Sequence, residues 1–286
     1  MKSTWAYVLS FFVFGGISCQ SDDPTPNPHA KTIEIIGHGG NGFQTYYQNL
    51  PENSWPSFEK ALFGLGIDGV EMDIQMTADG ALLLYHDQNL ITQTNCSGCI
   101  RQKQLEDVKD CVYRFGQSSS APKLLSFESF LTKTAPLHGT VSFYLDLKFF
   151  ENCRTNGEDF AAYFEEMSPN LTTLLESYDL VNSTVIEFSN ENVLANFKQN
   201  YPNFTAYHYQ SNFANEIAAT IESGADGIVI MNDRITKAQV KNAHAQGLKV
   251  CILTGGTLSS IRDAIDKGPD AIQTDNPILL KKLLHE

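Results

Sequence analysis

Three acidic residues stand where strands are expected to end, and their spacing predicts a cation site. Glu71 and Asp73 are two residues apart in DGVEMDIQ, so in a strand both side chains point to the same side. Carboxylates that close repel each other unless a cation lies between them, and Mg²⁺ or Ca²⁺ suits such oxygen ligands. Asp146 shares one face of the apolar segment FYLDLKFF with Lys148, where an acid is costly to bury without a metal or an ion pair. The alternatives are a solvated strand face for the first pair and an Asp146–Lys148 ion pair.

Two histidines are candidates for proton transfer beside these acids. His38 lies where the apolar run of IIGHGGNGF breaks into glycines, and His86 follows the apolar segment ALLLY. The Asp79-Gly80 pair between the two flanking strands is typical of a tight hairpin turn, and a hairpin centred on Ala78 and Asp79 places Glu71 opposite His86. A histidine with a pKa near neutrality can accept and return protons. A purely structural histidine in a glycine turn is the alternative for His38.

These motifs resemble a known family. GHGG and LPENSWPSFEKALFGLGIDGVEMDIQMTADGALLLYHDQNL are similar to the N-terminal part of glycerophosphodiester phosphodiesterases, where His-Arg-Gly, Pro-Glu-Asn, Glu-x-Asp, Thr-x-Asp-Gly and His-Asp follow in this order. PKLLSFESFL, YLDLK and GPDAIQTDNP are similar to later motifs of the family, but more loosely. The resemblance implies a phosphoric diester hydrolase that uses a divalent cation to convert glycerophosphodiesters into glycerol 3-phosphate and an alcohol.

The resemblance also implies a role for each site residue. Two histidines act as general base and general acid, three acids hold the cation, and two further residues bind the phosphate or order the site. The histidines are His38 and His86, and the three acids are Glu71, Asp73 and Asp146. The residues that bind the phosphate or order the site are Lys148 and Glu52. The cation and the lysine neutralise the charge that builds on the phosphate oxygens. The nucleophile is water or, through a cyclic phosphate, the neighbouring glycerol hydroxyl.

Three departures from the family pattern concern the substrate pocket. Gly39 stands where the family has arginine, so a bidentate phosphate donor is missing, and a lysine elsewhere is no geometric replacement for it. Asp146 stands where glutamate is usual and is one methylene shorter. CILTGG replaces the Trp-Thr-x-Asn of the family's late strand, so we expect one wall of the pocket to differ.

Two other functions remain open at this point. Hydrolysis of intact phospholipids or phosphoinositides would need an apolar rim at the site, for which Trp55, Phe149 and Phe150 are candidates. A non-catalytic surface lipoprotein is favoured only by Gly39. Nucleic-acid binding is excluded, because 20 Lys and Arg against 33 Asp and Glu give a net charge of −13, which a phosphate backbone would repel.

Alternating strand-like and helix-like segments predict the elements that position these residues. The expected strands are Ile33–Gly37, Gly69–Ile74, Ala81–His86, Val141–Leu147, Thr184–Phe188, Phe204–Tyr209, Asp226–Met231, Lys249–Leu253 and Ala271–Thr274. The expected helices include Ser54–Leu65, Glu158–Glu176, Glu191–Gln199, Asn215–Ser223, Thr236–Gln246 and Leu258–Asp266. This α/β pattern predicts a TIM (β/α)8-type barrel in which nine candidate strands compete for eight places. Residues 88–138 are expected to form an insertion over the barrel mouth, after the His86 strand.

The N-terminus has the pattern of an export signal. Residues 1–18 carry Lys2, an apolar stretch and then small residues, a layout typical of a secretory signal and too short for a stable membrane span. Cys19 after GGIS resembles the lipidated cysteine of bacterial lipoproteins. We therefore expect residues 19–31 to be a flexible tether and residues 32–286 the enzyme domain. The protein would be exported and lipid-anchored to the bacterial outer membrane, facing the periplasm or the cell surface. Plain secretion is the alternative.

Five cysteines remain in the domain. An oxidising compartment favours two disulfides among Cys96, Cys99, Cys111 and Cys153, and a zinc cluster of the same four is the alternative. Cys251 lies in an apolar strand and is expected to be a buried thiol. Among the histidines without a motif, His208 lies on an expected strand and is a candidate for substrate contact.

Overall fold

The computed structural model describes residue 1 and residues 33–43, 50–114, 121–155 and 159–285. The expected signal segment and tether lie outside the described residues. Within the described ranges, no helix combines the length and the apolar composition that crossing a bilayer requires.

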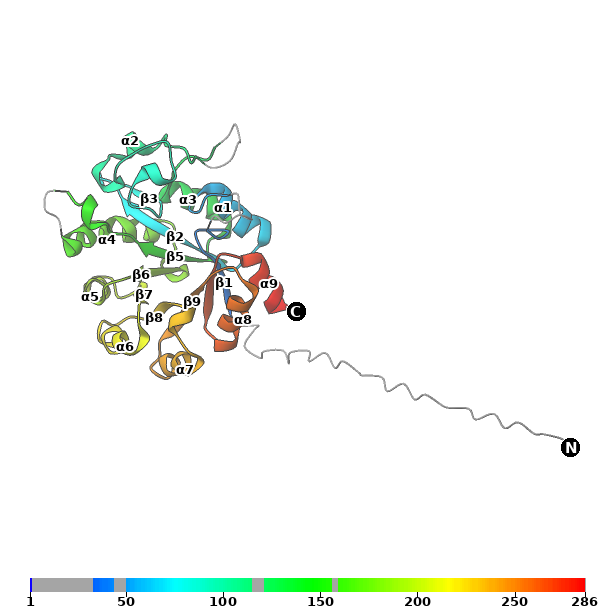
Figure 1. Ribbon diagram of the computed structural model, residues 1–286. Coiled ribbons are helices and arrows are strands. Elements are labelled where there is room, and N and C mark those ends of the chain that lie inside the picture. Colours follow the sequence, from blue (N-terminus) through cyan, green and yellow to red (C-terminus); the bar gives the residue numbers. More distant parts are fainter. Residues whose placement is uncertain (2–32, 44–49, 115–120, 156–158, 286) are drawn as a thin grey trace.

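A closed barrel of eight parallel strands forms the centre of the structure (Figure 1). The strands are β1 (Glu34–Gly37), β2 (Gly69–Met76), β5 (Ser142–Leu147), β6 (Thr184–Phe188), β7 (Thr205–Gln210), β8 (Gly227–Met231), β9 (Lys249–Thr254) and β10 (Ala271–Thr274). Each pairs in parallel with its neighbours, and β1 closes the ring by pairing with both β10 and β2. The predicted TIM-type barrel is confirmed. Its strands therefore all present their carboxyl ends at one mouth.

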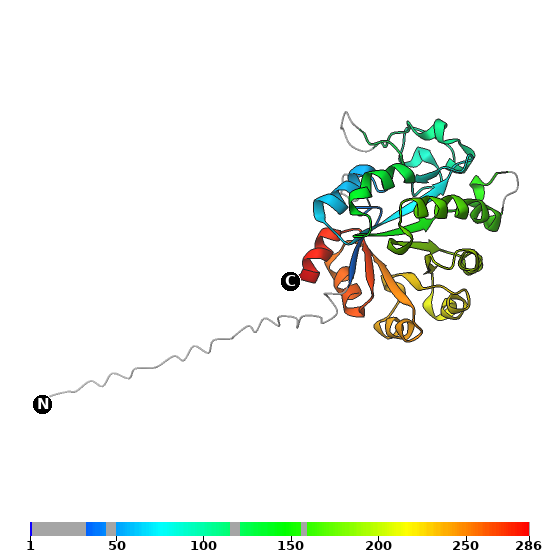
Figure 2. The same cartoon turned by 180° about the vertical axis from the view of Figure 1, so that it is seen from behind.

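Helices surround this barrel, as Figures 1 and 2 show from opposite sides. They are α1 (Trp55–Glu59) with a π-helical continuation (Lys60–Leu65), α3 (Phe127–Thr134), α4 (Phe160–Ser177), α5 (Glu191–Asn200), α6 (Phe213–Glu222), α7 (Lys237–Ala245), α8 (Leu258–Lys267) and α9 (Pro277–His285). Polar side chains of Asn190, Asn212, Thr236 and Thr257 accept first-turn N–H groups of the helices that follow them. Such caps satisfy donors that a helix start leaves unpaired. The main core lies between the helices and the strands.

Of the nine expected strands, Ala81–His86 is the one that lies outside the barrel. It forms β3 (Leu82–Leu84), which pairs antiparallel with β2, and β4 (Leu125–Ser126) pairs with β3 in turn. A connection this short leaves no room for a crossover helix, so the chain turns back as a hairpin. The barrel's second helix position is filled by α3, whose phenylalanines pack in the main core.

The predicted hairpin register is wrong by one residue. Ile74 pairs with Leu84, so Glu71 does not lie opposite His86. The reason is the loop of residues 78–80, which contains three residues instead of two and ends in a glycine with φ of 83°. A left-handed glycine at the end of a three-residue hairpin loop is common. A one-residue change moves every side chain of a strand to the other face.

The insertion shares a second, small hydrophobic core with β3 and Tyr85, to which it contributes Tyr113 among other residues. Two disulfides cross-link it, Cys96–Cys111 within the insertion and Cys99–Cys153 to the loop after β5. Cys251 is buried and free. The expected pair of disulfides is confirmed and the zinc alternative is wrong. Because small cores are weakly stable alone, Cys96–Cys111 stabilises the insertion itself, and Cys99–Cys153 ties it to the barrel mouth.

Candidate active site

The structure brings the three predicted acids together at the barrel mouth. Asp73 of β2 and Asp146 of β5 are directly paired in the sheet register, and Glu71 lies two residues before Asp73. One carboxylate oxygen from each of the three lies within 4.8 Å of the others. Glu71 and Asp73 are buried and Asp146 is partly exposed. Three carboxyl groups thus converge across two neighbouring strands.

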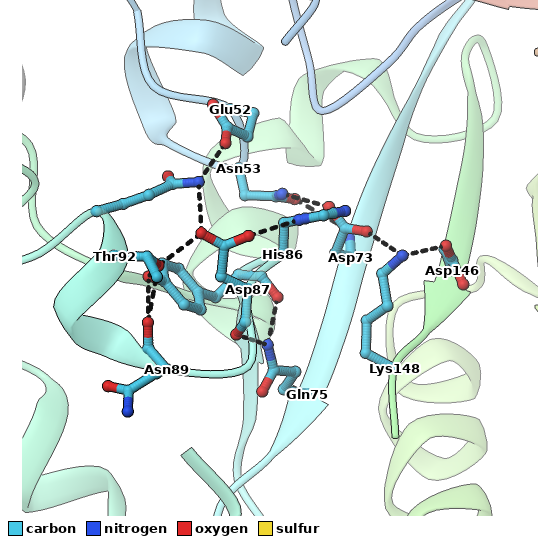
Figure 3. A network of polar contacts seen from close by, with 12 residues as sticks. Glu52, Asn53, Asp73, Gln75, His86, Asp87, Asn89, Thr92, Asp146 and Lys148 are labelled. Atoms are coloured by element: carbon cyan, nitrogen blue, oxygen red, sulfur yellow. Dashed lines mark hydrogen bonds and ion pairs between the residues drawn. The ribbon is translucent and has the colours of Figure 1, made fainter. Parts of the chain in front are cut away.

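The charges in this cluster fit a divalent cation. Burial and the nearby carboxylates raise the pKa of Glu71 well above its usual range. Nζ of Lys148 lies 2.9 Å from Oδ1 of Asp73 and 2.5 Å from Oδ2 of Asp146 (Figure 3). Burial opposes ionisation of Asp73, but the charges of Lys148 and His86 and the hydrogen bonds from Lys148 and Asn53 together outweigh burial and lower the pKa of Asp73. The Asp146–Lys148 ion pair is present, and the same ammonium group also contacts Asp73. One ammonium group shared by two of the three acids still leaves hard oxygen donors of the kind that Mg²⁺ and Ca²⁺ bind.

Backbone and amide groups hold two of the acids in place. The side-chain amide of Asn53 donates to Oδ2 of Asp73 at 2.6 Å, and its carbonyl oxygen accepts from the Asp73 backbone N–H at 3.0 Å. Asn53 has a φ of 58°, a left-handed conformation that asparagine tolerates better than most residues. The backbone N–H of Gly39 donates to Oε2 of Glu71 at 2.7 Å. The orientation of both carboxylates is therefore set before any ligand binds.

His38 lies directly after β1 and faces the same cluster. Its Nδ1 lies 2.8 Å from Oδ1 of Asp275, the residue that follows β10. Its Nε2 lies 3.9 Å from Oε2 of Glu71. Because a carboxylate only accepts hydrogen bonds, Asp275 favours the tautomer with the proton on Nδ1. The lone pair of Nε2 is then available at the mouth for proton transfer.

His86 is held by a second aspartate and by the insertion (Figure 3). Its Nδ1 lies 2.9 Å from Oδ1 of Asp87, whose Oδ2 accepts from the Thr92 hydroxyl at 2.5 Å and from the Gln93 amide at 3.3 Å. Burial opposes ionisation of Asp87, but these hydrogen bonds, led by that of Thr92, lower its pKa. The Gln93 amide also donates to Glu52. The predicted Glu52 thus connects to His86 through two residues and lies outside the three-acid group.

His208 does not lie at the site. It is buried, and its Nδ1 lies 2.7 Å from the Thr220 hydroxyl of α6. The side chain therefore packs on the helix side of β7, away from the barrel interior, and substrate contact is not supported.

Three acids near the site were missed as site residues from the sequence. Asp275 holds His38 and Asp87 holds His86. Asp275 directly follows an expected strand, and Asp87 directly follows His86 in the sequence. Glu187 of β6 pairs with Asp146 in the sheet register and is buried. Burial and the Asp146 charge raise the pKa of Glu187 well above its usual range. An acid inside the apolar segment TVIEF was the available signal, because the same reasoning selected Asp146.

The structure gives a physical reason for Gly39. Its φ is 57°, and a Cβ atom built there would lie 2.7 Å from Cβ of Glu52. Side chains are disfavoured in this backbone conformation, and real Cβ atoms do not approach so closely. The arginine of the family therefore cannot be accommodated at this position while Glu52 stays where it is.

Comparisons with known proteins agree with this architecture. Residues 41–279 match the glycerophosphoryl diester phosphodiesterase family. A glycerophosphodiester phosphodiesterase of Caldanaerobacter subterraneus subsp. tengcongensis is 24% identical over 259 residues, covering 90% of this chain and 99% of that protein. A solved glycerophosphodiester phosphodiesterase of Parabacteroides distasonis has a TM-score of 0.72 at 21% identity, with 89% and 97% of the two chains covered. An Oleispira antarctica phosphodiesterase, solved in complex with the product sn-glycerol-3-phosphate, has a TM-score of 0.75 at 20% identity, with 90% and 99% covered. The match over 41–279 shows that the chain belongs to the glycerophosphoryl diester phosphodiesterase family.

Proposed function

We propose that this chain hydrolyses glycerophosphodiesters to glycerol 3-phosphate and an alcohol, with a divalent cation held by Glu71, Asp73 and Asp146. The family makes the chain a phosphoric diester hydrolase. The observation that carries the finer proposal is the convergence of three carboxylate oxygens within 4.8 Å of one another, with His38 beside them. Mg²⁺ and Ca²⁺ both suit this donor set. A cation bound there supplies positive charge to a phosphate oxygen and so favours attack at phosphorus.

The histidines would carry the protons of this reaction. Aspartates occupy Nδ1 of both His38 and His86, which leaves Nε2 of each ring for catalysis. One ring starts with Nε2 unprotonated and takes a proton from the attacking hydroxyl as the new P–O bond forms. The other starts as the imidazolium and gives its Nε2 proton to the alkoxide as the ester bond breaks. The attacking hydroxyl belongs to water or to the neighbouring glycerol carbon.

Positive charge on the protein is scarce at this site. Among the residues that the structure describes, Lys148 is the lysine or arginine paired with these carboxylates, through Asp73 and Asp146, and Gly39 contributes a backbone N–H but no guanidinium. The negative charge that develops on the phosphate oxygens must be stabilised for the reaction to proceed. The proposed activity therefore depends strongly on the cation and on Lys148.

Release of glycerol 3-phosphate tests this proposal. The purified chain is incubated with glycerophosphocholine and Mg²⁺ or Ca²⁺, and the product is measured by a coupled dehydrogenase assay. We expect activity that chelator abolishes and that His38→Gln and His86→Gln reduce about 10² to 10⁴-fold, the usual contribution of one acid or base. Activity on phosphatidylcholine or phosphoinositide vesicles without activity on glycerophosphocholine would contradict the substrate assignment. Full activity in excess chelator would contradict the cation.

We also propose that the protein is exported and anchored to the outer membrane through lipid on Cys19. The support is the N-terminal sequence, in which GGIS precedes the cysteine and a polar, proline-rich segment follows it. Partition into Triton X-114 after expression in a bacterial host tests the anchor. The wild-type chain is expected in the detergent phase and Cys19→Ser in the aqueous phase. Aqueous partition of both would favour plain secretion.

A further inference from the structure

Phe43 contacts both of the histidines that the proposed reaction uses. Its ring centroid lies 4.1 Å from that of His38 at an interplanar angle of 34°, and 5.0 Å from that of His86 at 86°. The ring therefore lies against the face of one imidazole and meets the other nearly at a right angle. The two histidines come from different elements, one after β1 and one after β3.

The loop after β1 is built to place this ring. The backbone N–H of Phe43 donates to Oδ1 of Asp275 at 3.3 Å, the same oxygen that contacts His38. Gly42 has a φ of 99°, and a Cβ atom there would lie 2.1 Å from the carbonyl oxygen of Asp275. Only glycine allows the chain to pass so close to Asp275. A Cβ atom at Gly39 would lie 3.3 Å from Cε2 of Phe43, so the missing side chain at Gly39 leaves room for the ring.

A hydrogen bond alone does not fix an imidazole. Asp275 holds one atom of His38, Nδ1, and Asp87 holds one atom of His86. Each ring can still swing about that single contact, and the swing moves Nε2, the atom that transfers the proton. A second contact on the ring itself removes this freedom. Aromatic rings in offset or edge arrangements also attract each other beyond the effect of buried area.

We infer that Phe43 is a positioning residue for the two catalytic histidines. The inference rests on the proposed function. The phenyl ring fixes the plane of His38 and supports the edge of His86, so that both Nε2 atoms stay directed at the cation site. Phe43 itself has no group that could exchange a proton. Its loss should lower kcat with little change in KM, since errors of about 1 Å in catalytic groups can cost about 10²-fold.

Phe43→Leu and Phe43→Tyr test the inference, with Phe63→Leu as the matched control. Leucine keeps the apolar character but removes the ring, tyrosine keeps the ring, and Phe63 is an exposed phenylalanine on the π-helical segment. For Phe43→Leu we expect kcat on glycerophosphocholine to fall about 10 to 10²-fold, and for Phe43→Tyr most of kcat to return. Phe63→Leu should match the wild type. Circular dichroism and thermal melting confirm that each variant is folded.

A spectroscopic measurement separates this inference from the proposed function. With ¹³C-labelled histidine and His38→Gln for assignment, the ring-proton resonance of His38 should lie upfield in the wild type, because the phenyl face shields it. It should move downfield in Phe43→Leu and return in Phe43→Tyr. An unchanged resonance, or a changed resonance with an unchanged kcat, would overturn the positioning role. If the wild type hydrolyses no phosphodiester, the proposed function fails, and the resonance alone supports or overturns the ring contact.

Discussion

Replacing Asp275 with asparagine should disable His38 while leaving the shape of the site intact. Oδ1 of Asp275 lies 2.8 Å from Nδ1 of His38. A carboxylate there only accepts hydrogen bonds and keeps the proton on Nδ1. Asparagine can turn its NH₂ group toward Nδ1, which makes Nδ1 the acceptor and places the proton on Nε2. In that tautomer Nε2 of His38 cannot accept a proton from the nucleophile.

The magnitude follows from how much of the histidine's contribution is lost. A general base contributes about 10² to 10⁴-fold, and the His38–Asp275 pair is partly exposed, with side-chain exposures of 19% and 25%. Water can therefore compete for Nδ1 and part of the population keeps the active tautomer. We expect kcat to fall about 10² to 10³-fold, or about 3–4 kcal/mol in transition-state stabilisation. KM should change little.

Asp270→Asn is the matched control for this variant. Asp270 precedes the strand that Asp275 follows, so it lies at the opposite end of the barrel, and it also contacts a histidine, His244, at 2.9 Å. Steady-state kinetics on glycerophosphocholine should show a loss for Asp275→Asn and none for Asp270→Asn. Repeating the assay with a nitrophenyl phosphodiester, whose leaving group needs no protonation, identifies the lost step: recovery indicates an acid and persistent loss indicates a base. An Asp275→Asn enzyme within about twofold of wild-type kcat would refute the tautomer argument.

Three further predictions concern the cation, the disulfides and pH. Mg²⁺ or Ca²⁺ should raise the melting temperature of the wild type but not of Asp73→Asn, because only the wild type gains binding free energy in the folded state; equal shifts would place the cation elsewhere. Peptide mapping without reductant should recover Cys96–Cys111 and Cys99–Cys153, with Cys251 reacting with thiol reagents only after unfolding; prompt labelling would contradict its burial. Against the effect of burial, hydrogen bonds led by that of Lys249 lower the pKa of Asp270. A lowered pKa stabilises the fold above the unfolded value of about 3.9 and the gain is lost as pH falls. Asp270→Asn should therefore melt below the wild type at neutral pH, and the gap should close in acid; a constant gap would refute this.

The barrel could be predicted because its strands are short apolar segments between clear helix and turn signals. The expected strands Thr184–Phe188 and Ala271–Thr274 coincide with β6 and β10. Because parallel strands of this kind are buried on both faces, nearly every residue in them is apolar. Partner choice carries no such local signal, so the sequence left nine candidates for eight places. The register of the β2–β3 hairpin was missed because Asp-Gly suits both a two-residue and a three-residue loop.

The candidate site was likewise predictable only in part. Glu71, Asp73 and Asp146 were selected from charge at strand ends, and sheet pairing, which is local geometry, brings them together. The partners of the histidines depend on contacts between distant segments: His38 and Asp275 are 237 residues apart in the chain. The side chains of loop residues such as Phe43 depend on the conformation of the whole loop. Sequence spacing contains too little information to predict those contacts.

Gly39 illustrates why single departures from a family pattern can mislead. From the sequence its glycine is a loss, because a phosphate-binding guanidinium is missing. In the structure the same glycine donates its N–H to Glu71, and the space that a side chain would need is taken by Glu52 and by the ring of Phe43. Glu52 in turn connects through Gln93 to Asp87, and the Phe43 ring contacts both histidines. The glycine, the glutamate and the phenylalanine therefore form one packing unit. Restoring arginine alone would displace groups that hold the histidines, so the missing charge cannot be returned without rebuilding the surrounding contacts.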